Sequence, residues 1–415
     1  MTANQTTRLK TNFDSLDFLS ESSTLTTLET AADLFVHYDN DKAQIWASSR
    51  DWFMEQWGRD TFISLPGLLL TTEKYDAARK VFLDFAQYER GGLIPNRIRD
   101  GIILYNTADG SLWFVHALKM YIEATQDWAF IQQLLPRLRN IILGYMRGAT
   151  YERTGKEYRI GMDDRDGLIG SPAQASWMDA DPAGDGSEPV TPRAGKCVEI
   201  NALWYNALRF VIDVEKRLDP HVDVTELETQ ASRVKVSFQK FWNDKTGCLY
   251  DVIDSDETGS AIRPNQIFAI SHGLDLLTSE QKEAVLAVVK RDLLTAGGLR
   301  TLSPHDPLYK GEYDTSAPVD IKDLGYHQGT VWPWLIGAYC DALRIVKGDQ
   351  VDGEIGEVIA PLVNFCLESE FKSLPEVFSG NSLEPGGTTS QAWSVAEVLR
   401  ISKGCSFRLR NYRQT

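Results

Sequence analysis

The stretch from Asp51 to Leu70, DWFMEQWGRDTFISLPGLLL, carries the pattern that decides the fold. Aromatic residues flank a Gly58-Arg59-Asp60 turn, and an apolar segment with helical character follows it. Pro66 leaves two helix starts open. If Asp60 caps the helix, Pro66 lies in its interior and kinks it, whereas a cap at Ser64 places Pro66 in the first turn.

The same plan of polar turn, aromatic residue and apolar helix recurs along the whole chain. The residues that open these segments are Trp57, Trp113, Trp204, Phe268, Trp332 and Trp393. They follow one another at about 60 residues, apart from one interval of about 90, and such self-similarity indicates a repeated helix pair. A helix that is apolar on every side is expected to be buried. The segments between them are amphipathic, and residues 25–38 supply a further amphipathic helix before the first repeat.

Six buried helices surrounded by six amphipathic ones predict an all-α fold, the (α/α)6 barrel, with short β hairpins only in the loops. An open α-solenoid is the alternative, but its inner helices would show a more polar concave face. We expect an N-terminal extension over residues 1–24 and a single barrel domain over residues 25–415. The long interval comes from an irregular, Asp-rich segment at residues 161–195, and a loop of this length in a compact domain is usually functional or disordered.

Composition narrows the classes of partner. The formal net charge of −15 argues against nucleic acid or an anionic membrane surface. Five cysteines without paired short spacing indicate reduced thiols, and no apolar stretch is long enough to span a bilayer. Because signatures of a Cys/His metal set, a dinucleotide fold and a P-loop are missing from the sequence, we expect no metal and no cofactor. These features together predict a cytoplasmic protein.

In such a barrel the inner helices all begin at the same end, so the turns that precede them converge on one funnel. Carboxylates and amides can bond sugar hydroxyls there, and indole faces can cover the C–H face of a pyranose. The predicted substrate-binding residues are Trp57, Arg59, Asp60, Asp109, Trp177, Glu199, Asn201, His327, Gln328, Trp332, Gln391 and Trp393.

Two carboxyl groups stand out as candidates for acid–base chemistry. Asp179 follows Trp177 and Met178 in the long loop, where partial desolvation would raise its pKa. Glu376 opens the loop before the last inner helix. Glycoside hydrolysis usually needs two carboxyl groups whose pKa values are pushed apart. The alternative is that each side chain caps a helix or pairs with a nearby cation.

Nine stretches between residues 45 and 402 resemble, in the same order, the C-terminal amylo-α-1,6-glucosidase domain of glycogen debranching enzymes. They are WGRDTFISLPGLLL, GLIPNRI, YNTADGSLWFVHAL, GLIGSPAQASWMDA, TPRAGKCVEINALWYNAL, GLRTLSPHDPLYKGEY, YHQGTVWPWLIGAYCDAL, LPEVFSG and TTSQAWSVAEVLR. The resemblance implies an (α/α)6 barrel that removes the single glucose left at a glycogen branch, by hydrolysis with inversion. It also implies Asp179 as general acid, Glu376 as general base, Arg59 and Asp60 as the grip on the terminal glucose, and Trp177 beside it.

The resemblance has one departure. Debranching enzymes usually carry more chain in front of this domain, so here a separate glucanotransferase or phosphorylase is the expected partner on a branched α-glucan or oligosaccharide. Related (α/α)6 barrels cleave other bonds, and the fold alone does not fix the linkage. A smaller α-glucoside, cleaved in the manner of a glucoamylase or trehalase, and a catalytically silent glucan-binding protein both stay open as alternatives.

Overall fold

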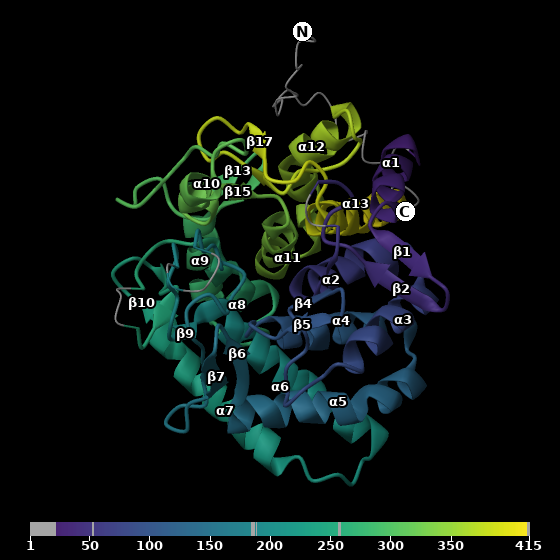
Figure 1. Ribbon diagram of the computed structural model, residues 1–415, viewed down its shortest axis with the longest axis vertical. Coiled ribbons are helices and arrows are strands. Elements are labelled where there is room, and N and C mark those ends of the chain that lie inside the picture. Colours follow the sequence, from purple (N-terminus) through teal and green to yellow (C-terminus); the bar gives the residue numbers. More distant parts are fainter. Residues whose placement is uncertain (1–21, 52–53, 184–186, 188, 256–258, 413–415) are drawn as a thin grey trace.

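Two concentric rings of helices build the molecule (Figure 1); the computed structural model describes residues 22–51, 54–183, 187, 189–255 and 259–412. The inner ring consists of α2 (Gly58–Leu65), α4 (Gly110–Thr125), α6 (Val198–Leu218), α8 (Phe268–Ser271), α11 (Leu335–Lys347) and α13 (Ala392–Tyr412). The outer ring consists of α1 (Ser22–Asp33), α3 (Tyr75–Ala86), α5 (Trp128–Arg147), α7 (Thr225–Phe238), α9 (Ser279–Asp292) and α12 (Asp352–Glu368).

The inner ring is closed. Each inner helix packs against the next one along the chain, and α13 packs against α2. This closure confirms the predicted (α/α)6 barrel and excludes the open solenoid. Aromatic side chains join the two rings: the ring of Phe62 on α2 lies 5.0 Å from that of Phe85 on α3 and 4.9 Å from that of Phe114 on α4.

The first inner helix resolves the question that Pro66 posed. α2 begins at Gly58, ahead of both predicted caps, so Asp60 lies in the first turn, where the helix dipole favours a carboxylate. The chain stays helical through Pro66 by widening into a π turn over Pro66–Leu70, in which the Thr71 N–H donates to the Pro66 carbonyl over 2.9 Å. Such a bulge accommodates the missing proline N–H without ending the helix.

The strands are short and lie in the loops, as predicted, and some of them join into small sheets in addition to hairpins. The largest sheet has five strands in the order β13 (Leu294–Thr295), β14 (Gly298–Arg300), β15 (Val331–Trp332), β16 (Val377–Phe378) and β17 (Pro385–Gly386). Strand β15 leads towards α11, and β16 directly follows Glu376. The sheet therefore ties together the loops that precede the last two inner helices.

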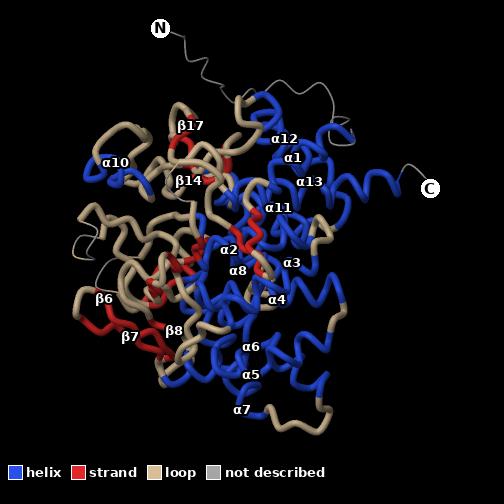
Figure 2. The backbone as a smooth tube through the Cα atoms, turned by 45° about the vertical axis from the view of Figure 1, so that its right-hand side comes forward, coloured by secondary structure: helices blue, strands red, loops and turns tan. Residues whose placement is uncertain are grey.

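The remaining strands make smaller sheets in other loops. Three-stranded sheets join β3 (Gln56–Trp57), β4 (Arg97–Arg99) and β5 (Ile102–Leu104), and β6 (Ala149–Arg153), β7 (Lys156–Met162) and β8 (Ile169–Gly170). Pairs form between β1 (Val36–Asp39) and β2 (Lys42–Ile45), β9 (Lys196–Cys197) and β12 (Val252–Ile253), and β10 (Trp242–Asn243) and β11 (Cys248–Leu249). Figure 2 shows most of the strands and the longer loops, among them β6, β7, β8, β14 and β17, on one side of the helices.

Three further details differ from the predicted elements. The helix predicted over residues 25–38 ends at Asp33, and the chain continues into β1. The fourth inner helix is short, a 3-10 turn over Pro264–Ile267 followed by α8. A helix that the sequence pattern did not predict, α10 (Val319–Tyr326), lies in the loop before α11. Of the extension predicted at residues 1–24, residues 1–21 lie outside the described part of the chain.

None of the helices in the described ranges is long and apolar enough to cross a membrane. The five cysteines are buried thiols.

Candidate active site

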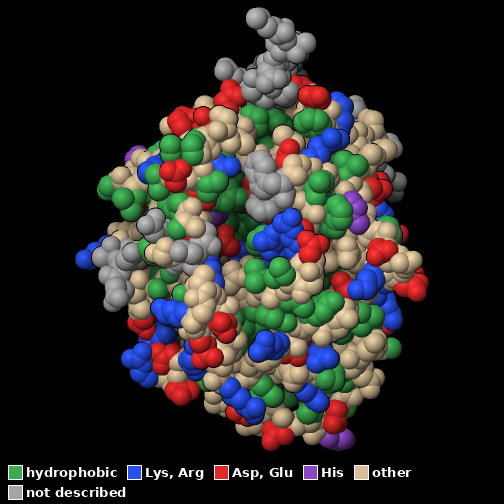
Figure 3. Space-filling model, viewed as in Figure 1, with side chains coloured by type: hydrophobic (Ala, Val, Ile, Leu, Met, Phe, Trp, Pro, Cys, Tyr) green, Lys and Arg blue, Asp and Glu red, His purple; other side chains and the backbone are tan. Residues whose placement is uncertain are grey.

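A cavity of about 270 Å³ opens where the inner helices begin. Eight of the predicted site residues line it: Trp57, Arg59, Asp60, Trp177, Asp179, Trp332, Glu376 and Trp393. Figure 3, seen from the same side as Figure 1, shows a hollow near the middle of this face with acidic and hydrophobic side chains in it. The volume lies just under the ~300–1,000 Å³ of typical small-molecule sites, which suits a single sugar ring.

Arg59, on the first turn of α2, is a buried cation that lines this cavity. Its Nε lies 2.9 Å from both carboxylate oxygens of Asp109, and its Nη2 donates to the Thr107 hydroxyl over 3.1 Å. Its Nη1 donates to Asp179 Oδ2 over 3.0 Å. Asp109 is fully buried and lies behind Arg59, outside the cavity lining. Asp109 therefore orients the guanidinium, which in turn holds Asp179.

Asp60, next along α2, is a buried carboxyl group. Burial raises the pKa of Asp60 to about 8, although the charge of Arg59 opposes this shift; nearby Glu376 and Asp179 add to it. Gln391 donates from Nε2 to Asp60 Oδ1 over 3.3 Å. Gln391 thus reaches the site through Asp60 and does not line the cavity.

Glu376 is held by two donors. The Tyr326 hydroxyl donates to Glu376 Oε1, and the Thr388 backbone N–H donates to Oε2 over 3.0 Å. Its exposure is only 2 %. Burial raises the pKa of Glu376 to about 7, and the hydrogen bonds from Tyr326 and Thr388 work against that rise. Glu376 is therefore a carboxyl group that can gain or lose a proton near neutral pH.

Asp179 faces the cavity from the long loop. Its side chain is 30 % exposed. Burial raises the pKa of Asp179, and the charge and hydrogen bond of Arg59 oppose the rise. This is the direction predicted from its place after Trp177 and Met178. Asp60, Asp179 and Glu376 thus line one cavity, in which Arg59 bonds Asp179 and its charge acts on Asp60. The charges of Glu376 and Asp179 raise the pKa of Asp60, and this repulsion favours retention of a proton among the three groups. Such a site offers both a proton donor and a base.

Indole rings form the floor of the cavity. The ring of Trp177 lies 5.3 Å from that of Trp332, edge to face, and Trp332 lies 5.6 Å from Trp393. Trp177 is fixed by an Nε1–H bond of 2.7 Å to Asn265 Oδ1. His327 is fully buried and stacks on Trp332 at 5.2 Å, so it supports the floor from behind.

Two predicted contact residues lie away from the cavity and make structural contacts. Glu199 accepts two hydrogen bonds, of 2.6 and 2.7 Å, from the buried Arg193. Asn201 exchanges hydrogen bonds with the backbone of Ile169, at 2.7 and 3.1 Å. These hydrogen bonds occupy the polar atoms of both side chains. A polar residue near the start of an inner helix can face a neighbouring loop as readily as the funnel, so the sequence position alone did not distinguish the two.

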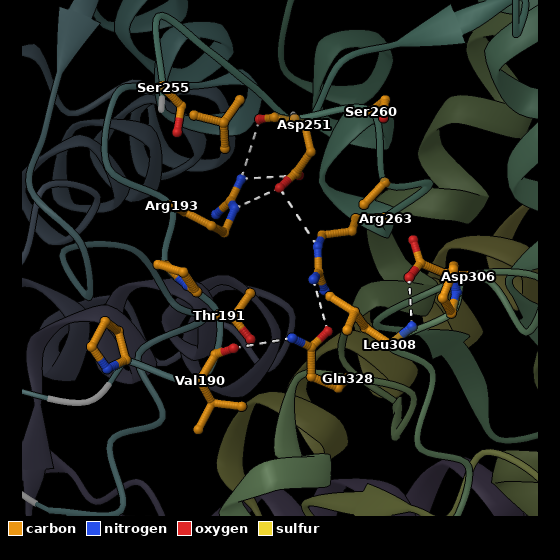
Figure 4. A pocket seen from close by; sticks show the side chains of 16 residues that line it. Val190, Thr191, Arg193, Asp251, Ser255, Ser260, Arg263, Asp306, Leu308 and Gln328 are labelled. Carbon is orange, nitrogen blue, oxygen red and sulfur yellow. Dashed lines mark hydrogen bonds and ion pairs between the residues drawn. The ribbon is translucent and has the colours of Figure 1, made fainter. Parts of the chain in front are cut away.

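Gln328 lies beside a different and larger cavity of about 770 Å³. Figure 4 shows its side chain between Val190 and Arg263: Nε2 donates to the Val190 carbonyl over 3.1 Å, and Oε1 accepts from Arg263 Nη2 over 2.8 Å. Arg193 donates to Asp251 across the same space over 2.7 Å. None of Asp60, Asp179 and Glu376 lines this larger cavity, so we assign no chemistry to it.

Four charged or hydroxyl side chains at the active-site cavity escaped the sequence prediction. Tyr326 and Asp323 come from α10, which is short and has no strong periodicity. Arg153 comes from the β6–β7 hairpin and donates to Asp181 over 3.1 Å. Asp181 was accessible from sequence, since it follows Asp179 by two residues. The other three have no local signal, because only the folded chain brings them to the funnel.

One group of three carboxylates in the described part of the chain has oxygens close enough to share a cation. It comprises Asp163, Asp166 and Asp254. The Lys196 ammonium lies 2.9, 2.8 and 2.6 Å from them, so a protein cation already neutralises the group.

A family model described as amylo-alpha-1,6-glucosidase matches residues 26–400. The chain belongs to this family. It is therefore a member of a glycoside hydrolase family, and its substrate class is carbohydrate. The glycogen debranching enzyme of Saccharomyces cerevisiae is 27% identical over 374 residues, which cover 70% of this chain and 24% of that enzyme. The chain thus spans about a quarter of the length of this relative.

Solved structures share the fold at low identity. An uncharacterized conserved protein from Thermus thermophilus superposes with a TM-score of 0.66 at 15% identity, covering 90% of this chain and 99% of its own. The GH63 mannosylglycerate hydrolase of the same organism, in complex with glucose, gives 0.65 at 15% identity and the same coverage. A rhamnosidase from Klebsiella oxytoca with rhamnose bound gives 0.58 at 14% identity, over 92% of this chain and 64% of its own.

Proposed function

We propose that the protein is an inverting, exo-acting glucosidase that removes α-1,6-linked glucose from branch points of glycogen-type glucans. The observation that carries the proposal is the pairing of Asp179 and Glu376 in one cavity of about 270 Å³, in a chain of the amylo-alpha-1,6-glucosidase family. A cavity of this size with an indole floor accommodates a terminal sugar and leaves no room for an internal chain segment. Exo action on single residues follows from that shape.

In this proposal Asp179 is the general acid. Its position at the more exposed edge of the cavity suits donation of a proton to the glycosidic oxygen, and its raised pKa favours the protonated form. Arg59 stabilises the carboxylate that remains after the proton has left. The Arg59 guanidinium thus opposes the rise in the pKa of Asp179 but stabilises the Asp179 carboxylate once the proton has been transferred.

Glu376 is the general base. It takes a proton from a water molecule, which attacks the anomeric carbon on the face opposite the leaving oxygen. Tyr326 and Thr388 fix the two oxygens of its carboxylate, so the base keeps one orientation. For a mechanism with inversion we expect the carboxyl groups of Asp179 and Glu376 to stand about 6.5–9.5 Å apart, which leaves room for that water.

The remaining residues of the site bind the sugar. Asp60 forms a hydrogen bond with a hydroxyl of the terminal glucose through Oδ2, since Gln391 engages Oδ1. The indoles of Trp177, Trp332 and Trp393 cover the C–H faces of the ring. A separate glucanotransferase or phosphorylase in a cytoplasmic setting would prepare the branched substrate.

The test measures free glucose released from a branched limit dextrin, with maltose and trehalose as parallel substrates. We expect release from the limit dextrin at a higher kcat/KM than from either disaccharide. Asp179→Asn and Glu376→Gln should each lower kcat by about 10²–10⁴-fold with unchanged circular dichroism. Asp223→Asn, at an exposed position outside the cavity, is the matched control and should keep full activity. Near wild-type turnover in either active-site variant would overturn the assignment of Asp179 and Glu376 as catalytic residues. A higher kcat/KM for maltose or trehalose would instead indicate that the substrate is a small α-glucoside.

A further inference from the structure

A second cavity, of about 250 Å³, lies inside the barrel further along the inner helices than the active site. We call it the rear cavity, and it is lined by side chains of α2, α4, α8, α11 and α13 together with Trp334. The two cavities share an indole partition: Trp334 stacks on Trp393 at 5.1 Å and meets the edge of Trp177 at 5.3 Å. Trp393 and Trp177 line the active site. The floor of one cavity is thus the wall of the other.

Two histidines face each other in the rear cavity. The ring centroids of His116 and His272 are 4.3 Å apart, and His272 is only 9 % exposed. Within the described part of the chain each ring hydrogen-bonds through Nδ1, so Nε2 of both is left for the cavity. His272 is buried and His116 is partly buried. An imidazole nitrogen without a partner in such a place is a hydrogen-bonding group that a bound molecule can satisfy.

The neighbours of His116 fix its tautomer. Asn206 Oδ1 accepts from Lys119 Nζ over 3.2 Å, which turns the Asn206 amide so that its Nδ2 donates to His116 Nδ1 over 3.2 Å. An Nδ1 that accepts leaves the proton of a neutral imidazole on Nε2. His116 therefore presents an N–H donor to the cavity.

His272 has the opposite tautomer. The Ser271 hydroxyl donates to the Ile267 carbonyl over 3.2 Å, so its oxygen accepts from His272 Nδ1 over 2.7 Å. The Nε2 of His272 then carries a lone pair. Burial lowers the pKa of both imidazoles, which keeps the pair neutral near pH 7. Side by side they offer one donor and one acceptor, and a hydroxyl group is the ligand group that can satisfy both.

The charged groups of the rear cavity disfavour an ionic ligand. Arg400 is held by Asp341 and Glu397, each at 2.7 Å, and Lys119 lies 4.0 Å from Glu123. The rear cavity thus contains two cations and three carboxylates, and each cation lies next to a carboxylate. A phosphate or carboxylate would meet net negative charge. Among the described residues no third carboxylate, imidazole or thiol atom lies close enough to both imidazoles to share a metal ion with them, which makes a poor metal site.

The walls complete the chemistry. Trp113, Phe268 and Trp334 line the rear cavity with aromatic surface, which suits the C–H faces of a sugar. We propose that the rear cavity binds a small neutral polyhydroxy compound, a free hexose, between these rings and the Nε2 atoms of His116 and His272. The site is separate from the catalytic cavity and would hold its ligand whether or not the protein hydrolyses a glucan.

The test follows histidine nitrogens directly by NMR in protein labelled with ¹⁵N-histidine, which has six such residues. Added D-glucose should shift the Nε2 signals of His116 and His272 saturably, while the exposed His221 and His305 stay unchanged. His327, behind the active-site indoles, reports the catalytic cavity separately. In His272→Phe the shift at His116 should vanish, or need at least tenfold more glucose.

Several outcomes overturn the proposal. If the signals of His116 and His272 do not change when glucose is added, the proposal is wrong. This measurement needs only the wild-type chain and does not depend on whether the variant folds. A response to Zn²⁺ alone, without one to glucose, would make the rear cavity a metal site. A response to inorganic phosphate at lower concentration than glucose would contradict the choice of a neutral ligand.

Discussion

Replacing Tyr326 by Phe removes one hydroxyl and isolates what that group does for Glu376. The hydroxyl donates to a carboxylate that is 2 % exposed and stabilises its ionised form. A hydrogen bond to a charged group contributes about 1.5–3 kcal/mol, which equals about 1–2 pKa units. Because the pKa of Glu376 is about 7 with the bond in place, it should rise to about 8–9 in Tyr326→Phe.

The assay is the pH profile of kcat/KM for glucose release from limit dextrin, between about pH 5 and 9. A general base works only when ionised, so activity falls as pH drops through its pKa. Tyr326→Phe should move this acidic limb upward by about 1–2 pH units and lower the rate at pH 6 by about 10–100-fold. The difference should narrow as the pH rises.

Tyr313→Phe is the matched control. Tyr313 stacks on Tyr326 at 5.7 Å but makes no hydrogen bond to Glu376 among the described contacts. Its loss should leave the acidic limb in place. An unchanged limb in Tyr326→Phe, or equal shifts in both variants, would refute the assignment of Glu376 as the base oriented by Tyr326.

Two further predictions concern the carboxyl groups of the site. In Gly387→Ala the new Cβ would lie 2.2 Å from Glu376 Oε2, so kcat should fall severely. Gly247→Ala is the control, because it has the same left-handed backbone cost of about 1–2 kcal/mol but no neighbouring atom within 4 Å. It should lower stability and leave the activity unchanged. For Asp60, whose pKa rises on folding to about 8, the protonated form is the one that folding favours, so its stabilising contribution is present at low pH and is lost as pH rises through about 8. The melting temperature of Asp60→Asn should therefore fall less between pH 5 and 9 than that of the wild type, and parallel curves would contradict this.

The rings of helices could be read from sequence because their signal is local. An aromatic residue after a polar turn marks each inner helix, and this pattern depends only on residues that are neighbours in the sequence. The sheets could not be read, since strands of two residues such as β15 and β16 show no alternation. α10 was missed for a related reason: with eight residues it barely completes two turns.

The site divides in the same way. Asp179 and Glu376 stand in distinctive local contexts, and both line the cavity. Glu199 and Asp109 look alike in sequence, as acids near the start of inner helices, yet one pairs with Arg193 and the other with Arg59. Only the folded chain shows which cation each acid meets. The bond between Tyr326 and Glu376 joins residues 50 positions apart and has no sequence signature.

The most direct test of the central claim is the anomeric form of the glucose first released from a branched limit dextrin. Proton NMR within the first minutes of reaction distinguishes the anomers before they interconvert. Asp179 as acid and Glu376 as base predict β-glucose as the initial product, cleaved from an α linkage by one displacement with inversion. Initial α-glucose, or no glucose at all from this substrate, would contradict the account.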